Sequence, residues 1–273
     1  MAKRKTQPTV GERKALVKNP LIVDGISRAG KFLLTNLLSG IAGVEPVQYR
    51  PVMEHVARLA RFGLIEKEVA RELIRTEADM ACYEMLIGRN LNHRKGDKSS
   101  IFNNAHPDAY LRRLKRPDGA AALVNFRKQK LMSLFIVHET LPNMGTIFEA
   151  FPDMRAIIMQ RSPLDLAYSW HLRKLPRRIG REALMGEINM KGQKSSVPWY
   201  VYDYEGVYAS LSGIDRTVFS ICTLFELYER AYVSLAAVRK KRVLRIRYED
   251  VLSDPESVMR AVSRFLKRDM LPG

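Results

Sequence analysis

A short apolar run near the start of the chain leads directly into a loop with a glycine at each side, and then into a helical pattern. Leu21-Ile-Val-Asp24 is typical of a buried strand, and apolar residues recur at a helical spacing from Phe32 onward. Between them stands Gly25-Ile-Ser-Arg-Ala-Gly-Lys31. A strand that enters a helix through such a loop is the opening unit of an α/β fold with a parallel sheet.

Three further apolar runs predict strands at 134–137, 155–159 and 243–247, and amphipathic patterns predict helices between them. Strands that alternate with helices form right-handed βαβ units. We therefore predict an α/β three-layer sandwich whose central parallel sheet has about four to five strands.

The domain organisation follows from the same pattern. Residues 1–18 are basic and aperiodic and are predicted to form a flexible arm, followed by a single domain at 19–273. Helical patterns and polar stretches with glycine and proline predict a helical and loop insertion at about 45–130, after the first βα unit.

The chain is strongly basic, with 46 Lys and Arg against 29 Asp and Glu and a net charge of +17. Such a surface attracts anions. The two cysteines make neither a disulfide framework nor a metal pattern, and no apolar run is long enough for a signal peptide or a membrane span. We expect a cytoplasmic protein with no transmembrane segment, no metal and no specific nucleic acid partner.

The loop at 25–31 has the composition of an anion-binding site. Its glycines let backbone N–H groups approach phosphate oxygens, the helix N-terminus adds partial positive charge, and Arg28 and Lys31 add two full charges. Gly25-x-x-x-x-Gly-Lys31 also matches a P-loop up to its last position, where Phe32 replaces the Ser or Thr that holds Mg²⁺. This departure favours a transfer that needs no metal over a triphosphate-dependent enzyme.

Two more motifs join this loop in a resemblance to the sulfotransferases that use 3′-phosphoadenosine 5′-phosphosulfate (PAPS). The family's loop, Gly-x-x-Arg/Lys-Ser-Gly-Thr-Thr, is similar to residues 25–32. Its strand-end motif Arg-Asp/Asn-Pro-x-Asp-x-x-x-Ser is similar to Arg161-Ser-Pro-Leu-Asp-Leu-Ala-Tyr-Ser169, and its Tyr-Glu-Asp-Leu-x-x-Asp-Pro to Tyr248-Glu-Asp-Val-Leu-Ser-Asp-Pro255. The motifs keep the family's order across residues 20–266. The resemblance implies a P-loop NTPase-like sheet and PAPS as the nucleotide co-substrate.

The resemblance also implies site residues. Arg28, in the family's position for the catalytic cation, and Lys31 would stabilise the charge that builds on the leaving phosphate. Arg161 and Ser169 would hold the 3′-phosphate. The nucleotide-binding residues predicted in this way are Gly25, Ile26, Ser27, Arg28, Ala29, Gly30, Lys31, Phe32, Arg161, Ser169 and Tyr248.

A base must take a proton from the acceptor, and His138 is the first candidate. It follows the strand predicted at 134–137, where the family's small-acceptor members carry a catalytic histidine, and an imidazole can take up a proton near neutral pH. Glu139 is a rival base, and a purely structural role for His138 stays open. The predicted catalytic residues are Arg28, Lys31 and His138.

Two other functions fit parts of the sequence. A triphosphate-dependent kinase or ATPase fits the loop alone, and a non-catalytic polyanion-binding protein fits the charge, including basic runs at 112–116 and 173–178. We expect a sulfotransferase that transfers a sulfuryl group to a hydroxyl or amine, because all three motifs agree with it. The basic runs favour an anionic acceptor, and the family varies its acceptor pocket in segments that correspond to 92–120 and 171–211.

Overall fold

The centre of the computed structural model, which describes residues 9–11 and 13–272, is a five-stranded sheet in the order β2-β3-β1-β4-β7. Every neighbouring pair in it is parallel. The strands are β1 (Leu21–Gly25), β2 (Val44–Tyr49), β3 (Met132–Ile136), β4 (Arg155–Gln160) and β7 (Val243–Arg247). The predicted parallel sheet of four to five strands is confirmed.

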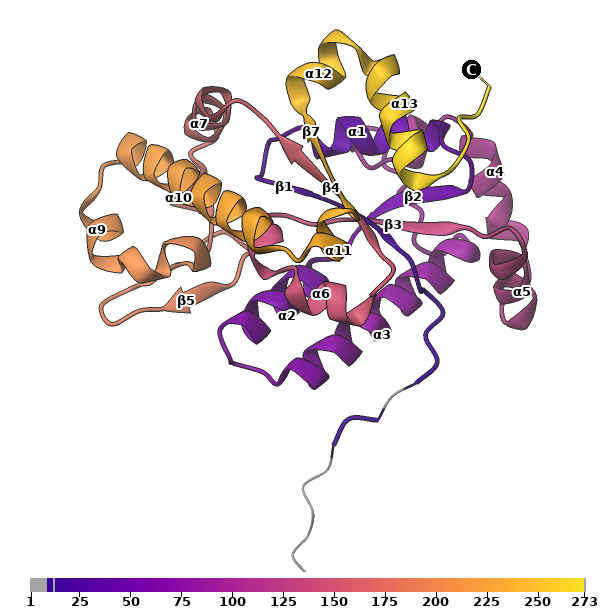
Figure 1. Cartoon of the computed structure of the whole chain (residues 1–273), viewed down its shortest axis with the longest axis horizontal. Helices are drawn as coiled ribbons and strands as arrows, with labels where there is room; N and C mark the ends of the chain where they lie inside the picture. Colours follow the sequence, from indigo (N-terminus) through magenta and orange to yellow (C-terminus); the bar gives the residue numbers. More distant parts are fainter. Residues whose placement is uncertain (1–8, 12, 273) are drawn as a thin grey trace, which may run out of the picture.

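Helices cover both faces of this sheet, as Figure 1 shows. On one face lie α1 (Lys31–Leu37), α12 (Tyr248–Ser253) and α13 (Pro255–Leu266), and on the other lie α2 (Pro51–Arg61), α3 (Lys67–Leu86) and α6 (Gly145–Ala150). The predicted three-layer α/β arrangement is therefore confirmed. The other helices are α4 (Pro107–Leu111), α5 (Ala120–Lys128), α7 (Pro163–Leu172), α8 (Leu175–Arg178), α9 (Glu205–Ser210), α10 (Gly213–Ser234) and α11 (Ala237–Lys240). A small antiparallel hairpin joins β5 (Asn189–Lys191) to β6 (Ser196–Pro198).

The middle of the sheet explains why its strands are visible as apolar runs. β1 pairs with β3 on one side and with β4 on the other, and Leu21, Ile22 and Val23 are completely buried. A parallel strand with helices on both of its faces has no solvent side, so the side chains on both faces are apolar. Asp24, also completely buried, is the exception, and it lies at the carboxyl end of β1 where the site begins.

The edge strand β2 lies almost entirely inside the segment predicted as an insertion, and the residue pattern of 44–49 does not predict a strand. Pro46 interrupts the run, and the pairing register with β3 shifts between Val44 and Val47. Proline has no backbone N–H to donate, and it is tolerated at a sheet edge because one side of the strand has no partner strand there. Glu45 is buried because Arg113 binds it with two hydrogen bonds of 2.6 and 2.9 Å.

The described residues just before β1 pack against α3. The guanidinium of Arg13 and the backbone N–H groups of Leu16 and Val17 all donate to the Asp79 carboxylate, at 2.7–2.8 Å. Residues 13–17 of the predicted arm are thus held by one buried acid, while its residues 1–8 and 12 lie outside the described residues. Within the described part of the chain, none of the helices combines the length and apolar character that crossing a membrane requires.

Candidate functional site

The carboxyl ends of four strands converge on one pocket, which we call the loop pocket. The loop after β1 supplies most of its wall, His138 follows β3, Arg161 follows β4, and Tyr248 begins α12 directly after β7. Its volume is about 180 Å³. The residues that line it are Ser27, Arg28, Gly30, Lys31, Phe32, Leu33, Lys98, His138, Arg161 and Tyr248. Ligands of open parallel sheets bind at this edge.

Two glycines fix the shape of the loop because no larger residue fits at either position. Gly30 has a φ of +91°, and a Cβ there would lie 2.3 Å from the Tyr248 ring. Gly25 has a φ of +152°, and a Cβ there would lie 2.5 Å from the carbonyl oxygen of Met159. Gly30 therefore lets α12 pack against the loop, and Gly25 lets β1 end against β4.

Two backbone carbonyls of the loop are held by side chains from neighbouring elements. The indole Nε1 of the fully buried Trp170 donates to the Ser27 oxygen at 2.8 Å, and Arg161 donates to the Arg28 oxygen at 3.0 Å. These bonds fix the backbone in one conformation before any ligand arrives. A loop that is already ordered loses less conformational entropy when a ligand binds.

Arg28 and Arg161 line the pocket, and Arg173 is near enough for its charge to act on Arg28, so this region has an excess of positive charge. Arg161 lies 4.5 Å from the centre of the Tyr248 ring, and none of Arg28, Arg161 and Arg173 forms an ion pair with a carboxylate among the described residues. Burial lowers the pKa of Arg28, and the charges of Arg173 and Arg161 lower it further. An anion that binds between these guanidinium groups would relieve their mutual repulsion.

Lys31 is turned into the loop and away from solvent. Its side chain is buried, and its ammonium donates to the carbonyl oxygens of Gly25 and Ile26. Burial lowers the pKa of Lys31, and the nearby carboxylates of Glu139 and Asp24 oppose this shift. Two of the three N–H donors of the Lys31 ammonium are therefore already used inside the loop.

Glu139 occupies the inner side of the same loop. Its carboxylate accepts a hydrogen bond from the backbone N–H of Ser27, and the residue is buried with a φ of +48°. One of the N–H groups that a cradle would offer to a ligand is therefore already used inside the protein. The geometry gives Glu139 the role of counter-charge to Lys31 and leaves it poorly placed to reach an acceptor.

His138 is held by a carboxylate that the sequence analysis did not single out. The Glu54 carboxylate, on α2, accepts the backbone N–H of His138 at 2.6 Å and lies 3.7 Å from its Nδ1. That Nδ1 is buried and has no hydrogen-bond partner, while the ring lines the loop pocket. The imidazole is thus backed by an acid on one side and faces the pocket with the other.

The ionisation of Glu54 is secured by its neighbours. Burial opposes ionisation, but the nearby His138, including the hydrogen bond from its backbone N–H, and the charge of the buried Arg58 outweigh it, so the pKa of Glu54 is lowered overall. The Tyr49 hydroxyl also donates to Glu54 at 3.1 Å. The sequence carried one signal for this group: Glu54 and Arg58 stand four residues apart on the buried face of α2.

The lining of the pocket differs from the predicted site at two residues: it lacks Ser169 and includes Lys98. Ser169 lies on α7 outside the pocket lining, where its hydroxyl accepts a hydrogen bond from Arg173 at 3.2 Å. Lys98, in the segment between α3 and α4, lines the pocket although the sequence analysis did not name it. Among the described residues, no three His, Cys, Asp or Glu side chains gather as metal ligands.

No protein-family model and no curated protein matches the sequence. Among solved structures, the chain is similar to the sulfotransferase domain from the curacin biosynthetic pathway, at 11% identity and a TM-score of 0.45, covering 94% of this chain and 75% of that one. It is also similar to the sulfotransferase domain from the Synechococcus PCC 7002 olefin synthase (16%, TM-score 0.44, covering 93% and 75%). A third is a sulfotransferase from Alicyclobacillus acidocaldarius (15%, TM-score 0.43, covering 94% and 85%). At these scores and identities, the function of the chain has to be argued from its own residues.

Proposed function

We propose that the chain is a sulfotransferase that moves a sulfuryl group from PAPS to a hydroxyl of an acceptor. The observation that carries the proposal is the convergence of the loop, two arginines without carboxylate partners and an acid-backed imidazole on one pocket. The loop and Arg161 suit the anionic donor, and His138 suits the acceptor. The three sequence motifs that resemble the family contribute to this one pocket through Arg28, Arg161 and Tyr248.

In this proposal the acceptor oxygen attacks the sulfur of the 5′-phosphosulfate, and the bond from sulfur to the bridging oxygen breaks. His138 takes the acceptor's proton. Arg28 stabilises the negative charge that builds on the departing phosphate, as preorganised cations do in phosphoryl transfer. Lys31, which lies close to the buried carboxylates of Glu139 and Asp24, adds little to this stabilisation. The products are a sulfate ester and 3′,5′-adenosine bisphosphate.

Glu54 acts here as a positioning residue. A carboxylate beside Nδ1 favours the imidazole tautomer with its proton on that nitrogen, which leaves Nε2 free to accept the proton from the acceptor. A small rotation of the His138 ring would bring Nδ1, now 3.7 Å from the carboxylate, into hydrogen-bond distance.

The 3′-phosphate would lie on the arginines at the rim. Arg161 is held over the Tyr248 ring, and Arg173 is fixed by its bonds to the hydroxyl and carbonyl oxygens of Ser169. We propose that these two guanidinium groups bind the phosphate and that Ser169 acts by positioning Arg173. This assigns to Arg173 a part of the clamp that the sequence analysis gave to Ser169.

Ligand-induced stabilisation tests the proposal. Addition of 3′,5′-adenosine bisphosphate at 100 times its Kd, without Mg²⁺, should raise the melting temperature by about 5 °C, since it stabilises the folded chain by about 2.7 kcal/mol. ATP with Mg²⁺ is the comparison ligand. Stabilisation by ATP with Mg²⁺ and none by the bisphosphate would favour a triphosphate-dependent enzyme and refute the proposal.

A further inference from the structure

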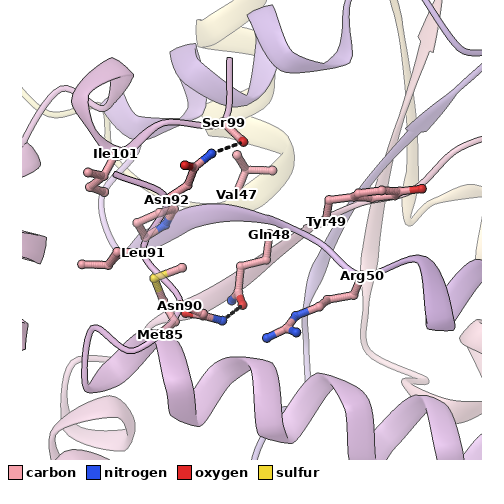
Figure 2. Close-up of a pocket in the computed structure, with 11 residues that line it drawn as sticks. Val47, Gln48, Tyr49, Arg50, Met85, Asn90, Leu91, Asn92, Ser99 and Ile101 are labelled. Carbon is pink, nitrogen blue, oxygen red and sulfur yellow. Dashed lines mark hydrogen bonds between the residues drawn. The ribbon is translucent and has the colours of Figure 1, made fainter. Parts of the chain in front are cut away.

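A second pocket, which we call the β2 pocket, opens along the edge strand of the sheet (Figure 2). Its volume is about 250 Å³, and it lies between β2, the end of α3 and the segment that follows α3. The residues that line it are Pro46, Val47, Gln48, Tyr49, Arg50, Met85, Asn90, Leu91, Asn92, Ser99 and Ile101. None of the predicted site residues lies in this pocket.

The β2 pocket is next to the loop pocket on two sides. Tyr49 forms part of its wall, and the Tyr49 ring meets the His138 ring edge-on with centroids 5.0 Å apart. Along the segment after α3, Lys98 lines the loop pocket and Ser99 lines the β2 pocket. A molecule bound against Tyr49 in the β2 pocket would therefore lie one side chain away from the candidate base.

The two pockets differ in charge. Lys98, Arg28 and Arg161 line the loop pocket without ion-pair partners among the described residues, whereas the only charged side chain on the β2 pocket is Arg50. Arg50 is compensated by Glu84 at 2.7 Å and by Glu77 at 3.6 Å. The β2 pocket therefore offers an anion no net attraction.

Two polar atoms in the wall of the β2 pocket lack partners. Gln48 is only 6% exposed, and its carbonyl oxygen accepts a hydrogen bond from Asn90 at 2.7 Å. The amide nitrogen of Gln48 and the carbonyl oxygen of Asn90 are buried without any hydrogen bond. A buried donor next to a buried acceptor is costly unless both are satisfied, and a hydroxyl can satisfy both because it donates and accepts. Asn90 is half-buried, and we take a rotation of its side chain as the movement through which a ligand would reach these atoms.

The remaining wall is apolar and suits a small molecule better than a peptide strand. Val47, Leu91 and Ile101 offer aliphatic surface. Although β2 is a free sheet edge, Pro46 and the register shift beside it interrupt that edge, which disfavours addition of an extended chain.

We infer that the β2 pocket is the acceptor subsite and that it takes an uncharged molecule carrying hydroxyl groups next to an aliphatic segment. The name acceptor rests on the proposed function, whereas the ligand class rests on the pocket alone. This class differs from the anionic acceptor that the overall charge of the sequence suggests, because the excess of positive charge lines the donor side.

Direct binding tests the ligand class without any turnover. The probes are hexyl β-D-glucoside and hexyl β-D-glucuronide, in which a carboxylate replaces the C6 hydroxymethyl group. Their binding to the chain without nucleotide is measured by calorimetry. We expect the glucoside to bind at least about tenfold more tightly, and Gln48→Leu to weaken it about threefold to tenfold, as for one lost hydrogen bond. Asn90→Ala, at a half-buried position, repeats the test, and the exposed Gln129→Leu is the matched control.

The outcomes separate the two proposals. Glucuronide binding as strong as glucoside binding, no binding of either, or equal glucoside affinity in Gln48→Leu, Asn90→Ala and wild type would overturn the subsite. Stabilisation by 3′,5′-adenosine bisphosphate is measured on the same samples. If the bisphosphate has no effect while the glucoside binds through Gln48, the sulfotransferase proposal fails and the ligand class of the β2 pocket stands.

Discussion

The substitution Glu54→Gln isolates the carboxylate that holds His138. The amide has nearly the same shape, and its oxygen can still accept the backbone N–H of His138, which now donates at 2.6 Å. What is lost is the negative charge 3.7 Å from Nδ1. The imidazolium that forms when His138 takes a proton then has no acid behind it.

The size of the effect follows from the type of interaction that is lost. A hydrogen bond to a charged group contributes about 1.5–3 kcal/mol, and one between neutral groups about 0.5–1.5 kcal/mol. The difference of about 1.4 kcal/mol, which applies once the proton has moved to His138, corresponds to about a tenfold fall in kcat. The KM for PAPS should stay within about twofold, because Glu54 does not line the loop pocket.

Sulfuryl transfer from labelled PAPS to the best acceptor found in a screen measures both constants across a range of pH. Glu68→Gln, which removes an exposed acid at the start of α3, is the matched control. The fall in kcat should be accompanied by a displaced pH profile, which a merely structural role would not produce. Unchanged kcat, or a parallel rise in the KM for PAPS, would refute the assignment of Glu54 as the residue that orients His138.

Three further predictions test other parts of the site. Arg161→Ala should weaken 3′,5′-adenosine bisphosphate about tenfold or more and leave adenosine 5′-phosphate nearly unchanged, as calorimetry can measure. Gly30→Ala should lower the melting temperature, because its Cβ would lie 2.3 Å from the Tyr248 ring. Burial, against the opposing charge of Arg58, raises the pKa of Glu187 from 4.5 to about 7. The free energy of unfolding should therefore fall as pH rises between these values, by up to about 3 kcal/mol, and Glu187→Gln should flatten that dependence in denaturant titrations.

The strands that could be predicted are those with helices on both faces. The apolar run that begins at Leu21 indicates a strand in the middle of the sheet, where each side chain packs against apolar neighbours. β2 was not predicted as a strand because its burial depends on partners far away in the sequence. Glu45 is buried against Arg113, which stands 68 positions later. A local pattern contains no information about such a partner, and Pro46 counts against a strand unless the strand is known to lie at an edge.

The same distinction applies to the site. Arg28, His138 and Arg161 could be named together because each lies within three residues of the end of a strand, and the carboxyl ends of parallel strands meet at one edge. Glu54 and Lys98 come from helices and loops whose placement the sequence does not determine. They were missed for that reason, and not because their residue types are unusual.

The position where the loop departs most from both motif patterns is explained by the charges around it. Lys31 replaces a hydroxyl residue of the sulfotransferase pattern, yet its ammonium lies among the Gly25 and Ile26 carbonyls and close to the charges of Glu139 and Asp24. A buried cation with buried counter-charges adds little net charge at the surface of the pocket. In the proposed function, the attraction for the phosphosulfate then comes from the arginines that have no acid partner among the described residues, together with the remaining loop N–H groups. In the same proposal, guanidinium and backbone N–H groups hold the anion, so the hydroxyl that Phe32 replaces is not required for binding.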